Sequence, residues 1–246
     1  MPHPLTDLLL AHRASGALLD GVADNLVPAD AATAYQVQTE TIAAIGPAGA
    51  WKVQPYPETG EPFTSPILKK DVYPPGAALK LADYAGIAIE AEVAVTIGRD
   101  LSDKSDYSSD DLRDAVASLH LAIEVVASRF VDRKKNPALV GIADLQNSGA
   151  VIVGPALVTS KWPALSQQAL SMLVDGEEVG STQGNGSTEN TLTSLAWLAN
   201  HAAARGLPLK AGDVIITGAR LGPLPLDGKE VVVNGPGFER VTAIFS

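Results

Sequence analysis

The sequence predicts an α+β fold. Two stretches near the N-terminus, residues 5–13 and 29–45, have apolar residues near helical spacing. Short strand-like segments separated by turn residues dominate the second half of the chain. Because these segments do not alternate regularly with helices, an α+β architecture is favoured over a doubly wound α/β sheet.

Length and composition narrow the class of protein further. The 246 residues suit one domain or two small ones. A net charge of −10 without a sizeable basic patch argues against nucleic acid and anionic lipid as partners. The absence of cysteine excludes disulfides and thiolate sites, so any metal must be held by oxygen or imidazole. Without a membrane-length apolar run or a signal-peptide pattern, we expect a soluble, cytoplasmic protein that does not enter a membrane.

The helix predicted over residues 29–45 has recognisable ends. Pro28 and Asp30 stand at its start, and Gly46 follows it. The next segment, residues 49–77, contains six prolines and three glycines and has few periodic apolar positions. We therefore expect an irregular segment there, either an active-site loop or mobile cover, or a plain surface connection.

Strict alternation of residue types predicts a β-strand over residues 87–97. An amphipathic helix follows over residues 109–118, and its start carries Ser108 and two aspartates that suit a helix N-terminus. The apolar run of residues 119–126 predicts a second strand.

The last third of the chain is predicted as a hairpin, a helix and several strands. Asp175-Gly176 between the apolar runs of residues 170–180 indicates a type I′ hairpin turn. A helix over residues 191–205 would stop at Gly206. Strands are expected over residues 213–217, 230–234 and 239–245, the last two joined by a turn at residues 235–237.

Glu90 and Glu92 lie two positions apart on the first predicted strand, so their carboxylates point the same way, with Cα atoms roughly 6.5–7 Å apart. The alternative is a solvated outer face of an edge strand. Glu124 stands alone in the second strand, where an unpaired buried charge is costly. Three carboxylates form a hard-oxygen site suited to Mg²⁺ or Mn²⁺. Arg129 is the alternative partner of Glu124.

His120 has two readings. By strand parity it shares the face of Glu124, so it could support the acidic site. The alternative is a hydrogen-bonded histidine of the core.

Several short motifs follow one another along nearly the whole chain. They are Ala34-Tyr35-Gln36-Val37-Gln38, Trp51-Lys52-Val53, Glu90-Ala91-Glu92, Ala122-Ile123-Glu124-Val125-Val126 with Ser128-Arg129, Ala143-Asp144, Leu195-Ala196-Trp197-Leu198-Ala199-Asn200 and Gly212-Asp213-Val214-Ile215-Ile216-Thr217-Gly218. In order and spacing they resemble the 2-keto-4-pentenoate hydratase and 4-oxalocrotonate decarboxylase branch of the fumarylacetoacetate hydrolase superfamily.

The resemblance implies a fumarylacetoacetate-hydrolase-like mixed β-sheet roll or barrel with an N-terminal helical segment. We expect a helical and loop segment over residues 1–76 and a catalytic domain over residues 77–246, together forming one compact unit. The implied Mg²⁺ or Mn²⁺ ligands are Glu90, Glu92 and Glu124, with the metal binding a 2-oxo acid. Lys52 and Asp71 are the implied catalytic pair, and the implied substrate-binding residues are Asp144, Thr217 and Gly218.

The implied function is a lyase of aromatic compound catabolism: a metal-dependent hydratase that adds water to a 2-hydroxy-2,4-dienoate. A 4-oxalocrotonate-type decarboxylase, an acylpyruvate-type C–C hydrolase and a catalytically silent 2-oxo acid-binding subunit stay open as alternatives. The family also implies a homo-oligomer, or a complex with a paralogous subunit. Gln54, Ala127 and Leu145 depart from the family pattern, which indicates an altered pocket.

Overall fold

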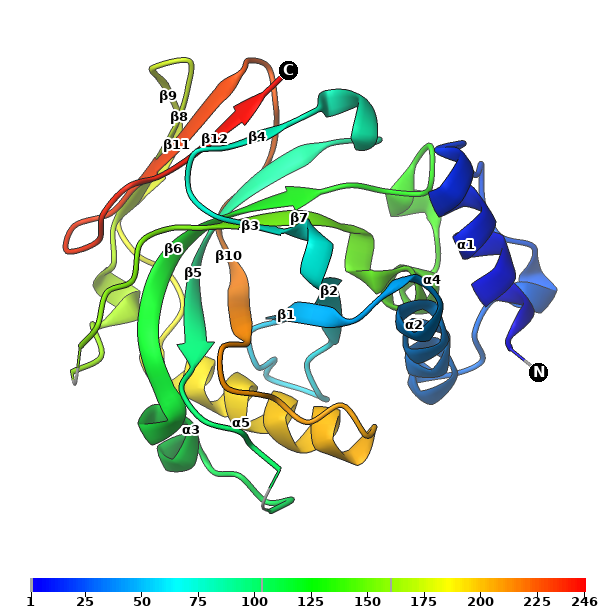
Figure 1. The fold of residues 1–246 in the computed structure, drawn as a ribbon, viewed down its shortest axis with the longest axis horizontal. Helices are drawn as coiled ribbons and strands as arrows, with labels where there is room; N and C mark the ends of the chain where they lie inside the picture. Colours follow the sequence, from blue (N-terminus) through cyan, green and yellow to red (C-terminus); the bar gives the residue numbers. More distant parts are fainter. Residues whose placement is uncertain (1, 103, 160) are drawn as a thin grey trace.

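The computed structural model describes residues 2–102, 104–159 and 161–246. Its centre is a mixed seven-stranded sheet (Figure 1). In spatial order the strands are β2 (Thr64–Leu68), β1 (Ala48–Val53), β10 (Val214–Pro225), β5 (Ala88–Ile97), β6 (Val116–Val126), β7 (Ser148–Val153) and β3 (Val72–Tyr73). Pairing is antiparallel except between β1 and β10 and between β3 and β7.

A second, five-stranded sheet packs against one part of the first (Figure 1). Its order is β4 (Ala77–Leu79), β12 (Val241–Phe245), β11 (Glu230–Asn234), β8 (Leu170–Val174) and β9 (Glu177–Thr182). Neither sheet closes into a barrel within the described residues, since each order has two end strands. The apolar layer between the sheets includes Ile89 and Ile123 of the larger sheet and Val233 and Phe245 of the smaller one.

Helices cover the remaining parts of the large sheet. They are α1 (Pro4–Ser15), α2 (Ala31–Ile45), α3 (Ser109–Ala115), α4 (Ala138–Ala143) and α5 (Thr188–Ala204). In Figure 1, α1, α2 and α4 group at one side of the molecule, and α3 lies next to α5 at the bottom. Short 3₁₀ helices occupy Asp24–Leu26, Lys69–Asp71, Leu81–Asp83, Arg133–Lys135, Leu145–Asn147 and Leu165–Gln167.

The predicted α+β class is confirmed, and so are most of the predicted elements. Asp30 caps α2 by accepting a hydrogen bond from the Thr33 amide, and Gly46 follows the last helical residue. The hairpin between β8 and β9 turns at Asp175 and Gly176, which both have positive φ as a type I′ turn requires. The helix predicted over residues 109–118 ends at Ala115, because residues 116–118 already belong to β6.

The prediction of an irregular segment over residues 49–77 holds for residues 54–63, which belong to no helix or strand, and is wrong for much of the remainder. This stretch contributes most of β1, all of β2 and β3, and the start of β4. Pro66 fits because β2 is an end strand of its sheet, where a missing N–H group costs little. Gly49 is needed for close approach, since a Cβ there would lie 2.6 Å from the Cα of Lys69. Pro66 and Gly49 therefore mark an edge strand and a close contact between segments, not a loop.

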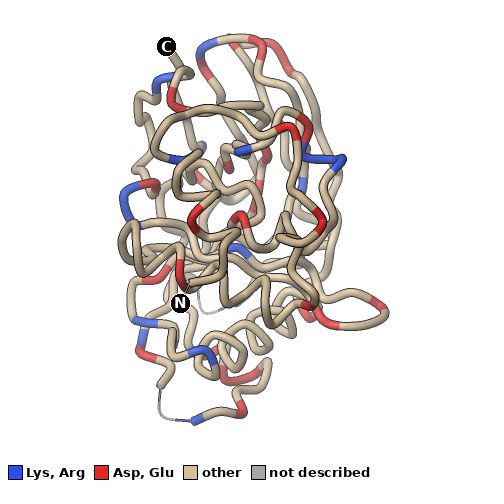
Figure 2. The backbone as a smooth tube through the Cα atoms, turned by 90° about the vertical axis from the view of Figure 1, so that its right-hand side faces the viewer, with Lys and Arg blue, Asp and Glu red and all other residues tan. Residues whose placement is uncertain are grey.

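Charge is spread over the molecule. Figure 2 shows Lys and Arg positions interspersed with acidic ones along the backbone. In the described part of the chain, none of the helices combines the length and the apolar character needed to cross a membrane.

Candidate metal centre

Three carboxylates meet on two adjacent central strands. Glu90 of β5 lies directly opposite Glu124 of β6 in the antiparallel register, and Glu92 is two residues further along the same face of β5. One carboxylate oxygen from each of the three lies within 4.8 Å of the others. Since β5 is flanked by β10 and β6, the alternative of a solvated edge strand is wrong.

Glu92 and Glu124 are buried, and Glu90 is partly buried. Glu92 is 2% and Glu124 is 1% exposed. Burial, reinforced by the charge of Glu124, raises the pKa of Glu90 to about 7. Burial and the charges of Glu124 and Glu90 likewise raise the pKa of Glu92 well above its usual range. Like charges opposite one another on neighbouring strands destabilise a sheet, so the arrangement calls for a positive charge.

Lys52 supplies one positive charge. It projects from β1, and its Nζ donates to Oε1 of Glu124 and, at 3.3 Å, to the carbonyl oxygen of Gln146. Burial favours the neutral amine, but the charge and hydrogen bond of Glu124 outweigh it and leave the pKa of Lys52 above its usual value. Arg129, the alternative partner of Glu124, pairs with Asp144 instead, so that alternative is wrong.

The remaining charge suits a divalent cation. When all three carboxylates are ionised, as metal binding requires, they and the Lys52 ammonium leave two negative charges at this wall of the cavity. Oε2 of Glu124 is buried and has no hydrogen-bond partner among the described residues. An all-oxygen donor set is the kind that Mg²⁺ and Mn²⁺ prefer, so the residues present fit such an ion.

These groups line one wall of a cavity of about 430 Å³. The other walls are largely apolar and include the side chains of Phe63 and Ile142. Gln54, Gln146 and Asn147 also line the cavity and contribute polar amide groups. A cavity of this size, apolar with a few convergent polar groups, is the usual form of a small-molecule site.

Gly218 is part of this cavity and fixes Glu92. Its amide donates to Oε2 of Glu92 at 2.7 Å. Its φ is +97°, and a Cβ at this position would lie 2.7 Å from Cδ of Pro55. Thr217 is buried behind the wall, where its hydroxyl donates to the carbonyl oxygen of Val93 at 2.7 Å. The structure therefore brings Gly218 to the cavity and leaves Thr217 as a support of the strand pair.

Asp71 and Asp144 are not among the residues that line this cavity. Asp144 is fully buried and accepts hydrogen bonds from Arg129 and Arg13. Asp71 lines a different cavity, together with Arg13 and Arg129. Lys52 and the three glutamates are thus gathered as the sequence suggests, whereas these two aspartates lie apart from them.

Gln146 and Asn147 line the cavity, although the sequence did not single them out. They belong to a turn, Leu145–Asn147, in which all three residues have positive φ. Left-handed backbone at non-glycine residues is costly and concentrates at functional sites. No local sequence signal announces this turn, apart from its position directly after Asp144.

The residues that depart from the family pattern have different surroundings. Gln54 lines the cavity beside Lys52. Leu145 is buried against Ile42 and Leu68 and is not among the lining residues. Ala127 lines the second cavity. Of the three departures, Gln54 is therefore the one that touches the cavity holding the carboxylates.

His120 is a hydrogen-bonded core histidine, as one of its two readings predicted. Its Nε2 lies 2.8 Å from the Thr96 hydroxyl and 3.0 Å from that of Ser118, and its Nδ1 lies 2.9 Å from the carbonyl oxygen of Gly154. Both ring nitrogens are therefore occupied by hydrogen bonds within and beside β6.

Comparison with known proteins adds to this geometry. Residues 35–243 match the family model described as fumarylacetoacetate (FAA) hydrolase C-terminal. A 2-keto-4-pentenoate hydratase of Burkholderia vietnamiensis is 33% identical over 164 residues, which is 67% of this chain. The TodF product hydratase of Pseudomonas putida is 33% identical over 173 residues, covering 70% of this chain and 63% of that protein. The chain spans 62% of the length of the Burkholderia hydratase.

A solved structure agrees with the fold over nearly the whole chain. The 4-oxalocrotonate decarboxylase of Pseudomonas putida G7, complexed with magnesium and adipate, superposes with a TM-score of 0.85. The match covers 98% of this chain and 96% of the decarboxylase at 23% identity. At 23% identity, this match shows a shared fold and nothing about activity.

Proposed function

Because the chain belongs to the fumarylacetoacetate hydrolase family, we propose that its cavity is the active site of a metal-dependent hydratase. The reaction adds water to a 2-hydroxy-2,4-dienoate and gives a 4-hydroxy-2-oxo acid. The family membership confirms the resemblance inferred from the motifs. The observation that carries the proposal is the meeting of Glu90, Glu92, Glu124 and Lys52 at one cavity wall. Relatives at about one-third identity that bear hydratase names support it.

Glu90, Glu92 and Glu124 would hold a Mg²⁺ or Mn²⁺ ion. Such an ion supplies, when bound, positive charge for the substrate's carboxylate and 2-oxygen and for the negative charge that develops on that oxygen. The amide of Gly218 keeps Glu92 oriented, because it donates to one of the two carboxylate oxygens.

Lys52 would act as the general acid or base that transfers a proton to or from the substrate. Its Nζ stays protonated because Glu124 faces it, and it lies at the cavity wall within reach of a bound acid. The apolar side chains opposite, Phe63 and Ile142, would exclude bulk water from the conjugated chain of the substrate.

Gly218 and Thr217 would have different roles at the site. Gly218 would contact the substrate through its backbone, and Thr217 would hold that strand in place. The catalytic role of Asp71 and the substrate-binding role of Asp144 stay predictions, as do the homo-oligomer and the paralogous partner subunit.

Turnover with two substrates tests the proposal. Purified protein with Mg²⁺ or Mn²⁺ is incubated with 2-hydroxypenta-2,4-dienoate or with 2-oxo-3-hexenedioate, and conjugated absorbance and CO₂ release are followed. We expect loss of absorbance from the dienoate without CO₂, abolished by EDTA and by Lys52→Met. Release of CO₂ from the hexenedioate with an inert dienoate would establish a decarboxylase instead. No turnover but metal-dependent binding of 2-oxo acids would establish a silent binding subunit.

A further inference from the structure

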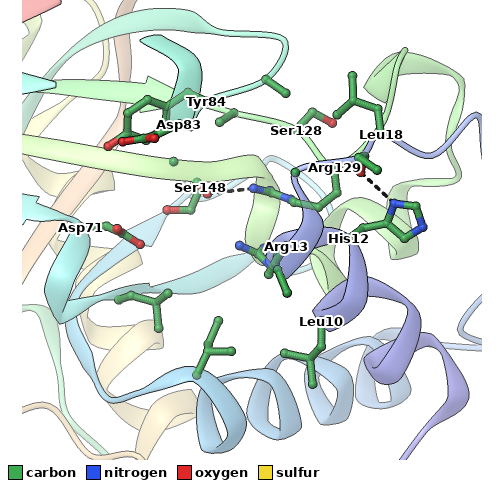
Figure 3. Close-up of a pocket in the computed structure, with 18 of the residues that line it drawn as sticks. Leu10, His12, Arg13, Leu18, Asp71, Asp83, Tyr84, Ser128, Arg129 and Ser148 are labelled. Atoms are coloured by element: carbon green, nitrogen blue, oxygen red, sulfur yellow. Dashed lines mark hydrogen bonds between the residues drawn. The ribbon is translucent and has the colours of Figure 1, made fainter. Parts of the chain in front are cut away.

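A second cavity of about 350 Å³ lies beside the first and shares no lining residue with it. It is bordered by the end of α1, by residues 82–85, by residues 127–129 and by the start of β7 (Figure 3). Arg13 of α1 lies outside the residues that match the family model, 35–243. The family match therefore covers most of the lining of this cavity but not the side formed by the end of α1.

Two guanidinium groups at this cavity share one carboxylate. Arg129 Nε donates to both oxygens of Asp144 at 2.9 Å, and an Nη of Arg13 donates to one of them at 2.9 Å. Asp144 is completely buried, so both arginines are anchored from behind. One carboxylate neutralises one guanidinium, so the arginine side of the cavity keeps a positive charge, and Asp71 faces it from the other side.

Among Arg13, Arg129 and Asp144, it is Arg13 that has a buried hydrogen-bond donor without an acceptor among the described residues. Its side chain is 14% exposed, and its Nε is buried without a hydrogen-bond partner among the described residues. A buried donor without an acceptor is costly. Burial lowers the pKa of Arg13 to about 10, so the guanidinium remains charged near neutral pH. A ligand carboxylate at the exposed edge of the guanidinium would pair with this charge.

The opposite wall offers acceptors. Figure 3 shows the Asp71 carboxylate across the cavity from Arg13 and Arg129, with Asp83 and Tyr84 above it. Among the described residues, Asp71 forms an ion pair with Lys70, whose Nζ lies 4.0 Å from Oδ1 of Asp71. The Lys70 side chain is 71% exposed. Such a pair contributes little and leaves the carboxylate free to accept a hydrogen bond from a ligand.

We propose that this second cavity binds a small carboxylic acid whose far end carries a hydroxyl or ammonium group. The guanidinium groups of Arg13 and Arg129 receive the carboxylate, because planar guanidinium matches a carboxylate in geometry and charge. Asp71 receives the donor at the far end. The cavity volume is in the range found for small-molecule sites.

Calorimetry with three matched probes tests the site. 4-Hydroxybutyrate has both ends, butyrate lacks the donor, and 1,4-butanediol lacks the carboxylate. Each is titrated into metal-free, EDTA-treated protein, so that no cation is left to recruit an acid to the glutamates. We expect saturable binding of 4-hydroxybutyrate, binding of butyrate weaker by about tenfold, and no binding of the diol. 4-Aminobutyrate is expected to behave like 4-hydroxybutyrate.

Variants locate the binding. Arg13→Gln is expected to weaken 4-hydroxybutyrate at least tenfold, and Glu90→Gln in the other cavity is the matched control that leaves it unchanged. Asp71→Asn is expected to reduce the preference for 4-hydroxybutyrate over butyrate, which keeps the test decisive if Arg13→Gln proves unfolded by circular dichroism. The proposal is overturned if 4-hydroxybutyrate fails to bind at tens of millimolar, if both folded variants bind it like wild type, or if Glu90→Gln abolishes binding.

Discussion

Glu90 shows how strongly the metal centre depends on single residues. It faces Glu124 across the strand pair and Glu92 along its own strand, so in the metal-free protein it adds to a local repulsion. The same carboxylate would be a ligand in the loaded protein.

The substitution Glu90→Gln is therefore expected to act in opposite directions with and without metal. It should raise the melting temperature of EDTA-treated protein at pH 7 and above, because the buried Glu90 carboxyl is costly to ionise and an amide carries no charge. It should also remove the stabilisation by Mg²⁺, which for an intact site reaches about 2.7 kcal/mol at a hundredfold excess over Kd. Thermal unfolding with Mg²⁺ and with EDTA measures both effects. An unchanged Mg²⁺ response in the variant would rule out Glu90 as a ligand.

Gly218 is the second residue on which the site depends. We expect Gly218→Ala to cost about 1–3 kcal/mol, since its φ of +97° is unfavourable for alanine and the new Cβ would meet Pro55. Gly206→Ala is the control, because its φ of +74° is also positive but no atom lies within 4 Å of the new Cβ. Urea unfolding of the two variants measures the difference. Equal losses would mean that Pro55 yields without cost.

At the scale of elements, the turn Leu145–Asn147 connects the two cavities. It begins after Asp144, which the arginines hold, and it presents Gln146 to the metal cavity, where the Gln146 carbonyl accepts from Lys52. Asn147 tolerates left-handed backbone, but Leu145 and Gln146 do not favour it, so these anchors hold the turn in place.

Relief of this strain is expected to stabilise the protein. Gln146→Gly should raise the free energy of unfolding by about 1 kcal/mol, because glycine adopts positive φ readily and the buried Oε1 of Gln146 has no partner among the described residues. Asn147→Gly is the control and should change little, since asparagine already tolerates this conformation. Chemical denaturation compares the two. A loss of stability in Gln146→Gly would show that its side chain contributes to packing.

At the scale of the whole molecule, α2 and α5 are joined by an aromatic contact that is sensitive to acid. The ring of His201 stacks on Trp197 and packs against Tyr35, with both ring centroids 4.5 Å away. Burial and the charge of Arg205 lower the pKa of His201 from 6.5 to about 4.

The folded state therefore resists protonation of His201 more than the unfolded state does. The stabilising contribution of the neutral ring is complete above pH 6.5 and is lost as the pH falls from 6.5 to about 4, because the unfolded chain binds the proton first. His201→Phe keeps an aromatic ring without a titratable group, so its stability should fall less over this interval. Parallel denaturation curves at several pH values measure the difference. Identical pH dependence in both proteins would contradict the assignment.

The sequence by itself determined the elements whose signals are local. Periodicity located β5 and placed Glu90 and Glu92 on one face, capping residues bounded α2, and Asp175-Gly176 set the hairpin turn. The motifs indicated the family, and the resemblance named the three glutamates and Lys52, which do meet. Each of these inferences needs no knowledge of distant contacts, because strand parity and turn chemistry act over a few residues.

Tertiary structure decided everything that depends on a partner far along the chain. Pro66 reads as a loop residue until β2 is known to be an edge strand. Glu124 takes Lys52 as its partner, 72 residues away, in place of the nearby Arg129. Arg129 and Arg13 converge on Asp144, which lies 131 residues from Arg13. The identity of a buried charge's partner is set by which side chains the folded sheets and helices bring within reach, and local sequence does not contain that information.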